Sequence, residues 1–140
     1  MDLNGLYLKE AGNRFGKSFR ALELVEGDIQ NDAIAFDPVE LIYAALILEY
    51  VNVDATFSQL HRLLSPGGTL VTVIQLSNAD IPAVTPSPYS SLQSLESIMR
   101  LIAPEFLQEV ARRNGLTQTA SSTRQAPGGK RFQVQTFRAD

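Results

Sequence analysis

The chain has 140 residues, of which 44% are hydrophobic and 19% are charged. This length fits one domain, since domains commonly span about 100 to 200 residues, and the apolar share excludes disorder as the main state. Twelve basic and fifteen acidic residues give a net charge of −3, which argues against a protein that mainly binds nucleic acid or anionic membranes. We therefore predict a single folded domain over residues 1–140 without a nucleic-acid partner.

Several residue types that carry chemistry are rare or missing. The absence of cysteine excludes a disulfide framework, a thiolate zinc site and a cysteine nucleophile, and the single histidine, His61, leaves little for a metal site. The longest apolar run, 41–48, is far shorter than the about 20 residues of a membrane span, and residues 1–4 lack the basic and apolar regions of a signal peptide. We predict a cytoplasmic protein with neither a metal site nor a membrane segment.

The first part of the chain predicts a helix and a short strand. Apolar residues at three- and four-residue steps favour a helix over residues 4–16, with Asn4 as N-cap and Gly16 as a left-handed stop. Residues 21–25 (Ala-Leu-Glu-Leu-Val) are a candidate for a short strand, which ends at the turn residues 26–28 (Glu-Gly-Asp). Asp28 is therefore expected at the carboxyl end of a strand.

The middle of the chain predicts a strand–helix–strand unit. Residues 39–48 are almost continuously apolar, which is typical of a strand covered on both faces by helices. Asp54 can cap a helix that runs to residue 64, and the β-branched stretch 69–76 predicts a second buried strand. Such a unit is usually a right-handed crossover between parallel strands, so the predicted fold class is α/β.

The last part of the chain predicts a loop, two helices and a hairpin. Three prolines make residues 77–89 an extended loop that is long enough to be a lid. Residues 92–102 have helical apolar spacing, and a proline at the first position favours a second helix over 104–113. Residues 116–123 and 131–138 flank a glycine-containing turn and predict an antiparallel hairpin.

Basic residues crowd the last thirty positions of the chain. They are either a patch for an anionic substrate or partner, or helix-end and edge-strand charges that face solvent. The second interpretation is favoured, since such charges are usually solvated surface. The residues are Arg112, Arg113, Arg124, Lys130, Arg131 and Arg138.

Three stretches are similar to the C-terminal part of class I S-adenosylmethionine-dependent methyltransferases. Residues 24–28 (Leu-Val-Glu-Gly-Asp) resemble the family's third strand with its acidic end, and residues 40–50 resemble its fourth strand. Residues 63–71 (Leu-Leu-Ser-Pro-Gly-Gly-Thr-Leu-Val) resemble the corner before the fifth strand and are the most specific of the three. The resemblance covers nearly the whole chain and implies a truncated Rossmann-like fold, with a mostly parallel sheet and a C-terminal antiparallel hairpin.

One feature of the family is missing from this sequence. None of the nine glycines forms the Gly-x-Gly loop that such proteins place after their first strand, and residues 1–4 resemble the stretch just past the second strand. The family's first two strands, which lie between its third and fourth, have no counterpart here. We therefore expect either a contracted five-stranded sheet, in which 21–25 pairs with 39–48, or a dimer joined across the open edge.

The resemblance implies a set of cofactor-binding residues. Asp2 matches the acid that holds the ribose hydroxyls, although a solvated terminal residue is an equal alternative. Asp28 matches the acid that accepts from the adenine amino group, with Ile29 beside the ring; the alternative is an acid in a strand-end turn. Four further residues lie toward the carboxyl end of the fourth strand, where packing alone explains the alanines equally well: Tyr43, Ala44, Ala45 and Leu46.

The resemblance identifies the protein as an enzyme that transfers a methyl group from S-adenosylmethionine to a small-molecule or protein acceptor. Glu49 and Tyr50 are candidates to face the substrate, or else form a turn that packs under the lid. No catalytic side chain is named, because aligning the reacting groups can suffice. The alternative is a non-catalytic methyltransferase-like module that acts through dimerisation or protein contacts. Neither a Gly-x-Ser-x-Gly elbow nor a Gly-x-x-x-x-Gly-Lys loop occurs.

Overall fold

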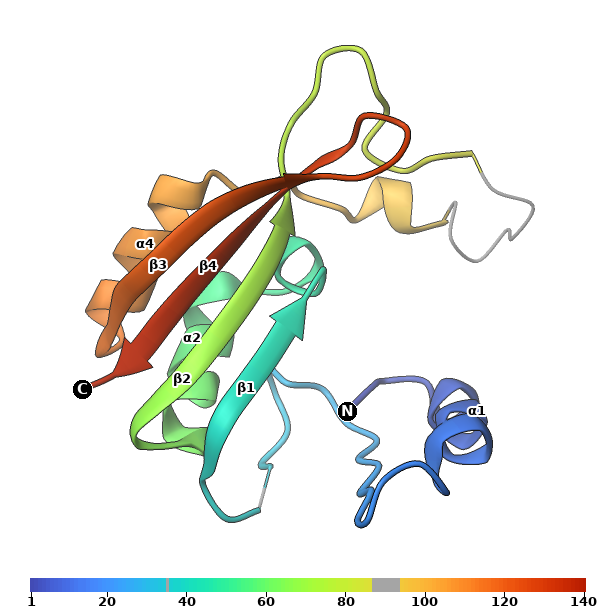
Figure 1. The fold of residues 1–140 in the computed structure, drawn as a ribbon, viewed down its shortest axis with the longest axis vertical. Helices are drawn as coiled ribbons and strands as arrows, with labels where there is room; N and C mark the ends of the chain where they lie inside the picture. Colours follow the sequence, from blue (N-terminus) through green and yellow to red (C-terminus); the bar gives the residue numbers. More distant parts are fainter. Residues whose placement is uncertain (35, 87–93) are drawn as a thin grey trace. The chain divides into compact units, whose positions relative to one another are not determined.

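The computed structural model describes residues 1–34, 36–86 and 94–140 (Figure 1). They form two compact units, one over Met1–Phe36 and one over Asp37–Asp140. The single methyltransferase-like domain expected over residues 1–140 stays a prediction.

The first unit is built around one helix, α1 (Gly5–Phe15). Asn4 caps it as predicted, because its side-chain oxygen accepts a hydrogen bond from the amide of Leu6 at 2.9 Å. Gly16 does not form the predicted left-handed stop, since its φ of −56° is that of an ordinary right-handed helix. The helix instead runs into a turn in which the Ser18 amide donates to the Phe15 carbonyl at 2.8 Å.

The strand predicted for residues 21–25 is wrong. The one isolated bridge among the described residues of the first unit is parallel and joins Asp2 to Glu26, the residue that follows this segment. The amide of Asp2 donates to Val25 and the amide of Gly27 donates to Asp2, both at 3.1 Å. A strand needs a neighbour with which to form a ladder, and the short stretch before α1 provides only this single partner position. No described residue of this unit is buried.

The second unit contains a four-stranded mixed sheet in the order β1-β2-β4-β3 (Figure 1). β1 and β2 are parallel, whereas β4 is antiparallel to both β2 and β3. The α/β class, the crossover unit and the C-terminal hairpin are thereby confirmed. The strands are β1 (Val39–Ala45), β2 (Leu64–Gln75), β3 (Leu116–Gln125) and β4 (Arg131–Ala139).

Two expectations about this sheet need correction. One of its three described pairings is parallel, so the sheet is mixed rather than mostly parallel. The described sheet also has four strands instead of the expected five. The fifth strand is missing because residues 21–25 form no ladder, which leaves β1 at the edge of the described sheet.

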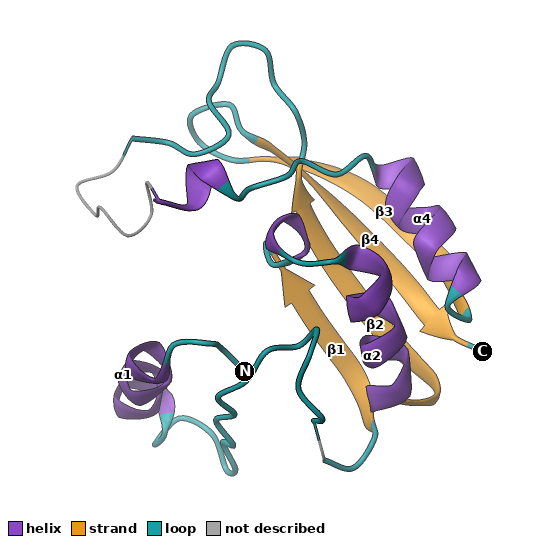
Figure 2. Cartoon of the chain, turned by 180° about the vertical axis from the view of Figure 1, so that it is seen from behind, coloured by secondary structure: helices purple, strands orange, loops and turns teal. Residues whose placement is uncertain are grey.

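Helices α2 (Val53–Leu63) and α4 (Pro104–Arg113) lie on the same face of the sheet (Figure 2). The proline begins α4 as predicted. The cap of α2 is Asn52 rather than Asp54, because the Asn52 side chain accepts from the amide of Ala55 at 3.0 Å. Asp54 instead pairs with Arg113 of α4 at 3.2 Å. None of the helices in the described ranges has the length and apolarity needed to cross a membrane.

The helix predicted over 92–102 is largely replaced by a short 3-10 helix, η2 (Ser94–Ser97). Residues 92 and 93 lie outside the described ranges. The amide of Arg100 donates to the carbonyl of Glu49 at 2.8 Å, so it is not available for a helical bond four residues back. The hydrogen bond from Arg100 to Glu49 therefore prevents the predicted helix from continuing through residue 100.

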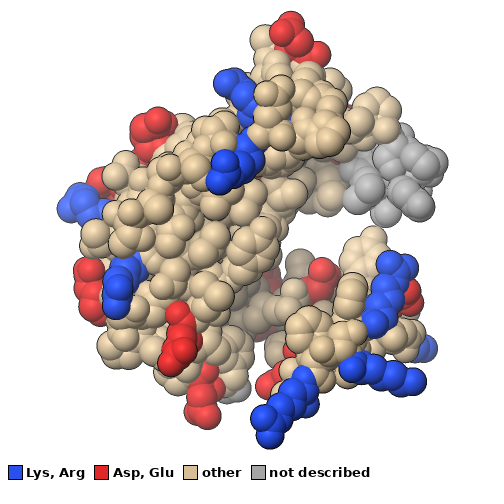
Figure 3. Space-filling view, viewed as in Figure 1, with Lys and Arg blue, Asp and Glu red and all other residues tan. Residues whose placement is uncertain are grey.

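The core of the second unit lies between the sheet and its two helices. Leu70 and Ile74 of β2 are fully buried, and Phe57 of α2 meets Phe137 of β4 edge to face, with ring centroids 5.9 Å apart. The prediction that the strands are covered on both faces is wrong. Leu41 remains 61% exposed, because α2 and α4 cover one face only. Figure 3 views the sheet from its other face, where charged side chains stand mainly at the margins.

Candidate functional site

Because β1 and β2 are parallel, the carboxyl ends of both strands lie at the same end of the sheet. β1 ends at Ala45, which pairs with Val73, and β2 ends two residues later at Gln75. Open α/β sheets bind their ligands beyond the carboxyl ends of parallel strands. We therefore expect the second unit to bind a ligand beyond the carboxyl ends of β1 and β2.

Leu46 turns the chain away from the end of β1. Its φ of 54° is the one positive value at a non-glycine residue in the described ranges, and such a conformation costs of order 1 kcal/mol or more. Its amide donates to the carbonyl of Val73 at 2.9 Å, which holds the turn in place. The chain then enters the short 3-10 helix η1 (Leu48–Tyr50). Strained backbone of this kind concentrates at ligand sites.

Glu49 joins η1 to the end of β2. Its side chain is almost completely buried, and Oε1 accepts a hydrogen bond from the amide of Gln75 at 2.7 Å. The other carboxyl oxygen, Oε2, has no partner within the described part of the chain. Burial raises the pKa of Glu49, and the hydrogen bond from Gln75 offsets part of that effect. The neutral carboxylic acid is therefore favoured more than in an exposed glutamate.

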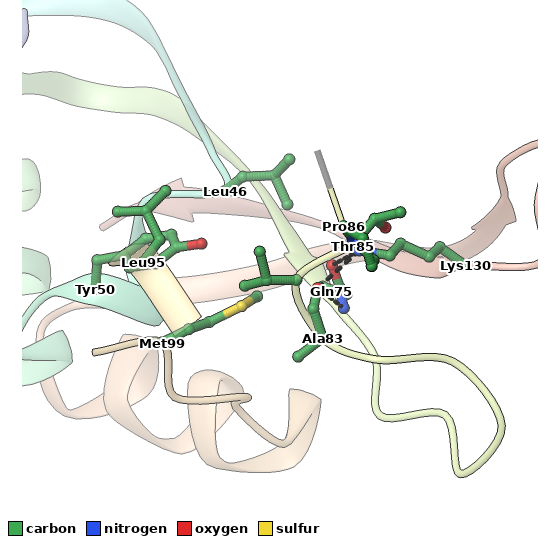
Figure 4. Close-up of a pocket in the computed structure, with 10 residues that line it drawn as sticks. Leu46, Tyr50, Gln75, Ala83, Thr85, Pro86, Leu95, Met99 and Lys130 are labelled. Carbon is green, nitrogen blue, oxygen red and sulfur yellow. Dashed lines mark hydrogen bonds between the residues drawn. The ribbon is translucent and has the colours of Figure 1, made fainter. Parts of the chain in front are cut away.

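A pocket of about 500 Å³ opens at these strand ends (Figure 4). This volume lies within the range of about 300 to 1,000 Å³ that is common for small-molecule sites. Its walls come from the ends of β1 and β2, from η1, from the loop after β2, from the η2 region and from the hairpin turn. The lining residues are Leu46, Tyr50, Gln75, Ala83, Val84, Thr85, Pro86, Leu95, Met99 and Lys130.

The loop after β2 is fastened to the wall of the pocket by two side chains. The carbonyl of Ala83 accepts from Lys130 Nζ at 2.7 Å and from Gln75 Nε2 at 2.9 Å. Lys130 Nζ also lies 3.4 Å from Gln75 Oε1, so the two side chains contact each other. Figure 4 shows these groups at one end of the pocket, and Leu46, Leu95 and Met99 toward the other.

The sequence-predicted residues of the second unit have different surroundings. Leu46 and Tyr50 line the pocket, whereas Glu49 is not among its lining residues and acts on it through Gln75. Tyr43 is 67% exposed; Ala44 is buried and Ala45 half-buried at the end of β1. Burial, with a further contribution from the charge of Glu49, raises the pKa of Tyr50. The cofactor-binding roles expected for these residues stay predictions.

Asp28 and Ile29, the residues expected beside the adenine ring, lie in the first unit. Asp28 Oδ1 accepts from the Gln30 amide at 2.9 Å and from the Gln30 side chain at 3.2 Å. Its Oδ2 accepts from the Asn31 side chain at 2.7 Å. These bonds lower the pKa of Asp28, the Gln30 amide most of all. Ile29 is half-buried next to this turn.

Asp2, the residue expected at the ribose, lies in the same unit. Its Oδ1 accepts from the amide of Asn4 at 2.8 Å, and its backbone forms the bridge to Glu26. The structure therefore brings Asp2 to the segment that leads directly into Asp28. These two acids belong to one unit, and the residues from Tyr43 to Tyr50 belong to the other.

Sequence reasoning missed several residues that line the pocket. Gln75 could have been found, because it ends a predicted parallel strand just as Leu46 follows one. Lys130 was grouped with the solvated charges of the C-terminal region, and nothing in the local pattern connects it with residues 55 positions earlier. Within the described ranges, no cluster of three or more His, Asp or Glu is placed to hold a metal ion.

Comparison with protein families identifies the chain. A family model described as a methyltransferase domain matches residues 1–72, which is just over half of the sequence. The chain belongs to the methyltransferase domain family. The expected membership of the class I S-adenosylmethionine-dependent methyltransferases is thereby confirmed. A search of curated protein sequences found no match to this methyltransferase chain.

Solved structures share the fold of this methyltransferase chain at low sequence identity. The N-methyltransferase NodS from Bradyrhizobium japonicum WM9, in complex with S-adenosyl-L-homocysteine, aligns with a TM-score of 0.72 and 17% identity, covering 99% of this chain and 64% of NodS. The [4+2]-cyclase SpnF aligns with a TM-score of 0.73 and 12% identity over 98% of this chain and 64% of SpnF. TehB from Haemophilus influenzae aligns with a TM-score of 0.67 and 16% identity over 99% of this chain and 48% of TehB. The methyltransferase chain thus spans between about half and two thirds of these proteins.

Proposed function

We propose that this chain forms part of an S-adenosylmethionine-dependent methyltransferase, and that the pocket at the ends of β1 and β2 receives the methyl acceptor. The observation that carries the proposal is the position of the pocket. It opens beyond the carboxyl ends of two parallel strands, where α/β folds bind ligands, in a chain of the methyltransferase family. The complex of NodS with S-adenosyl-L-homocysteine supports the choice of cofactor.

The acids of the first unit fit the adenosine part of this cofactor. An ionised carboxylate has about four acceptor sites, two on each oxygen. Asp28 uses both sites of Oδ1 and one of Oδ2 within its own turn, so one acceptor site remains for an amino group. Asp2 accepts one hydrogen bond, through Oδ1, which leaves acceptor sites for vicinal hydroxyls. S-Adenosylmethionine, when bound, supplies an electrophilic methyl group.

The methionine part of the cofactor has no such fit in this sequence. Backbone amides can approach a ligand closely where glycine replaces bulkier residues, yet no Gly-x-Gly stretch occurs among residues 1–140. We therefore assign residues of this chain to the adenosine part of the cofactor and to the methyl acceptor, and none to the methionine part.

The pocket residues contribute orientation and exclusion of water. Leu46, Leu95 and Met99 offer apolar surface to the body of an acceptor. The ordinary pKa of a tyrosine phenol already lies well above neutral pH, and burial raises that of Tyr50 further. The phenol therefore carries its proton and can donate a hydrogen bond to the acceptor. Positioning of this kind is the main requirement for methyl transfer to a nucleophile.

A second candidate function is a non-catalytic module that acts through protein contacts. The exposed strand β1 favours it, because Leu41 and Tyr43 present apolar surface at the edge of the described sheet. The fold by itself does not decide between the two functions, since the [4+2]-cyclase SpnF has a similar fold and is named for another reaction.

Titration of the chain with S-adenosyl-L-homocysteine, followed by amide chemical shifts in NMR spectra, tests the proposal. We expect saturable binding that is weaker than micromolar, because only part of the cofactor finds partners. Asp28→Asn should weaken it further, whereas Asp80→Asn, in the loop after β2, should leave it unchanged. If millimolar ligand shifts no resonance, the non-catalytic function is preferred. A dissociation constant tighter than micromolar would overturn the partial fit deduced above.

A further inference from the structure

The pocket at the strand ends is strongly divided in polarity. Most of its lining is apolar, and Lys130 is the one charged side chain among the described lining residues. Lys130, Gln75 and Thr85 lie together at one end (Figure 4). A ligand that fills the pocket therefore meets hydrocarbon over most of its length and an ammonium group at one end.

The ammonium group of Lys130 has unused capacity. It carries three N–H donors, and two of them face neutral oxygens, the Ala83 carbonyl at 2.7 Å and Gln75 Oε1 at 3.4 Å. None of the ion pairs formed by the described residues includes Lys130, although the residue is half-buried. A charge withdrawn from water without an opposite charge is unfavourable, so the site is suited to an anionic group.

The number of free donors selects the type of anion. One remaining N–H of Lys130, together with the hydroxyl of Thr85 at the same end, matches the two oxygens of a carboxylate. A phosphate is usually held by more donors, such as an arginine fork or a helix N-terminus, and neither stands among the described lining residues. No lining residue is acidic, so nothing in the described wall repels a carboxylate.

We propose that this pocket takes an amphipathic carboxylate, with its apolar body against Leu46, Leu95 and Met99 and its carboxylate on Lys130. This inference rests on the proposed function, since it gives the class of methyl acceptor for the same pocket. The proposal also gives Lys130 a role in ligand binding, whereas the sequence favoured the interpretation that its charge faces solvent.

A matched pair of probes tests the charge of the ligand. Calorimetry of the chain with 4-phenylbutyrate and with 4-phenylbutyramide compares a carboxylate with a neutral isostere. The amide can still accept a neutral hydrogen bond, and charge-assisted bonds are roughly twice as strong as neutral ones, so the carboxylate should bind about fivefold to tenfold more tightly. Lys130→Met should bring the ratio of the two dissociation constants close to one, and Lys130→Arg should keep the preference.

Two control variants separate charge from loop position. Gln75→Leu removes the other side-chain bond to the Ala83 carbonyl but keeps the ammonium group, so the carboxylate preference should survive. Lys9→Met, in α1, removes a lysine charge from the other unit and should change neither probe. Equal binding of both probes to the unmodified chain, or binding of neither, overturns the inference, as does tighter binding of 4-phenylbutyl phosphate than of the carboxylate.

The result is independent of cofactor binding. If the chain binds S-adenosyl-L-homocysteine but does not prefer the carboxylate probe, the proposed function is supported and the carboxylate pocket is refuted. If the chain prefers the carboxylate probe but does not bind S-adenosyl-L-homocysteine, the proposed function is refuted and an anion-selective pocket is still supported.

Discussion

Gln75 donates its backbone amide to the buried carboxyl group of Glu49 at 2.7 Å, just where β2 leaves the ladder. Its side chain meanwhile holds the carbonyl of Ala83 at 2.9 Å. One residue thus fixes η1 through its backbone and the following loop through its side chain, so two walls of the pocket depend on the position of a single strand end. This connection explains why a carboxyl group that does not line the pocket still bears on its shape.

Glu49→Gln should change how stability depends on pH. Burial raises the pKa of Glu49 above its ordinary value of 4.5, so the folded chain binds this proton more tightly than the unfolded chain does. The stability contributed by the protonated form is therefore lost as the pH rises from about 4.5 through the folded-state value. A tenfold difference in proton affinity between the folded and unfolded chains corresponds to about 1.4 kcal/mol of stability. We expect urea unfolding from pH 4 to pH 8 to show that the free energy of unfolding of Glu49→Gln increases relative to that of the unmodified chain as the pH rises.

Glu109→Gln provides the control of opposite sign. Arg112 bonds to Glu109 and lowers the pKa of this exposed carboxyl below 4.5. The ion pair therefore stabilises above about pH 4.5 and is lost as the pH falls below it, so the urea series for this variant extends down to about pH 3. The effect should be small, because solvent screens exposed pairs. If both variants change in the same direction with pH, the burial of Glu49 has been misjudged.

Leu70→Asp should abolish folding, whereas His61→Ala should be close to neutral. Leu70 is fully buried in β2, so an ionised carboxylate there has neither water nor a partner and should cost several kcal/mol, against a total stability of roughly 5 to 15 kcal/mol. His61 is half-buried on α2, with its ring near Gly115. Thermal melts followed by circular dichroism compare the two. A loss above about 2 kcal/mol for His61→Ala would mean that its contact with Gly115 matters more than its exposure suggests.

The elements that the sequence predicted well carry their signals locally. The start of α4 at Pro104 and the hairpin around residues 126–130 follow from backbone preferences of proline and glycine. The pattern of residues 39–48 predicted a strand, which the structure confirms over Val39–Ala45 but not beyond it, since Leu46 turns the chain toward η1. The surroundings of this strand were not predicted, because an apolar run does not tell how many of its faces will be covered. The strand expected at 21–25 failed for the same reason, since a ladder depends on a neighbour elsewhere in the chain.

The candidate site was predictable where it follows from strand ends. Leu46 and Tyr50 were expected at the carboxyl end of a parallel strand, and both line the pocket. Lys130 could not be predicted, because its place depends on the pairing of β4 with β2, which brings the hairpin turn to the loop after β2. No spacing rule in a single sequence connects those positions.

Leu46→Val should destabilise the chain, whereas Leu46→Gly should leave its stability almost unchanged. The φ of 54° at Leu46 lies in the region that glycine adopts freely and β-branched residues avoid. Relief of about 1 kcal/mol in the glycine variant is offset by the greater freedom of its unfolded chain, so its net change should stay within about 0.5 kcal/mol. The valine variant should lose about 1 to 2 kcal/mol. Guanidinium unfolding measures both, and equal losses would show that the turn is not strained.

The edge of β1 should make the chain self-associate. Within the described sheet β1 pairs only with β2, so the backbone groups on its other side have no ladder partner, and Tyr43 stands 67% exposed beside them. Unpaired strand edges with apolar side chains join to other strands, and a lysine at such an edge prevents this. Sedimentation velocity at rising concentration should show a dimer for the unmodified chain and a monomer for Tyr43→Lys. Phe106→Lys, which changes a 47% exposed apolar residue on α4, should leave the dimer intact. A chain that stays monomeric at hundreds of micromolar refutes association through this edge.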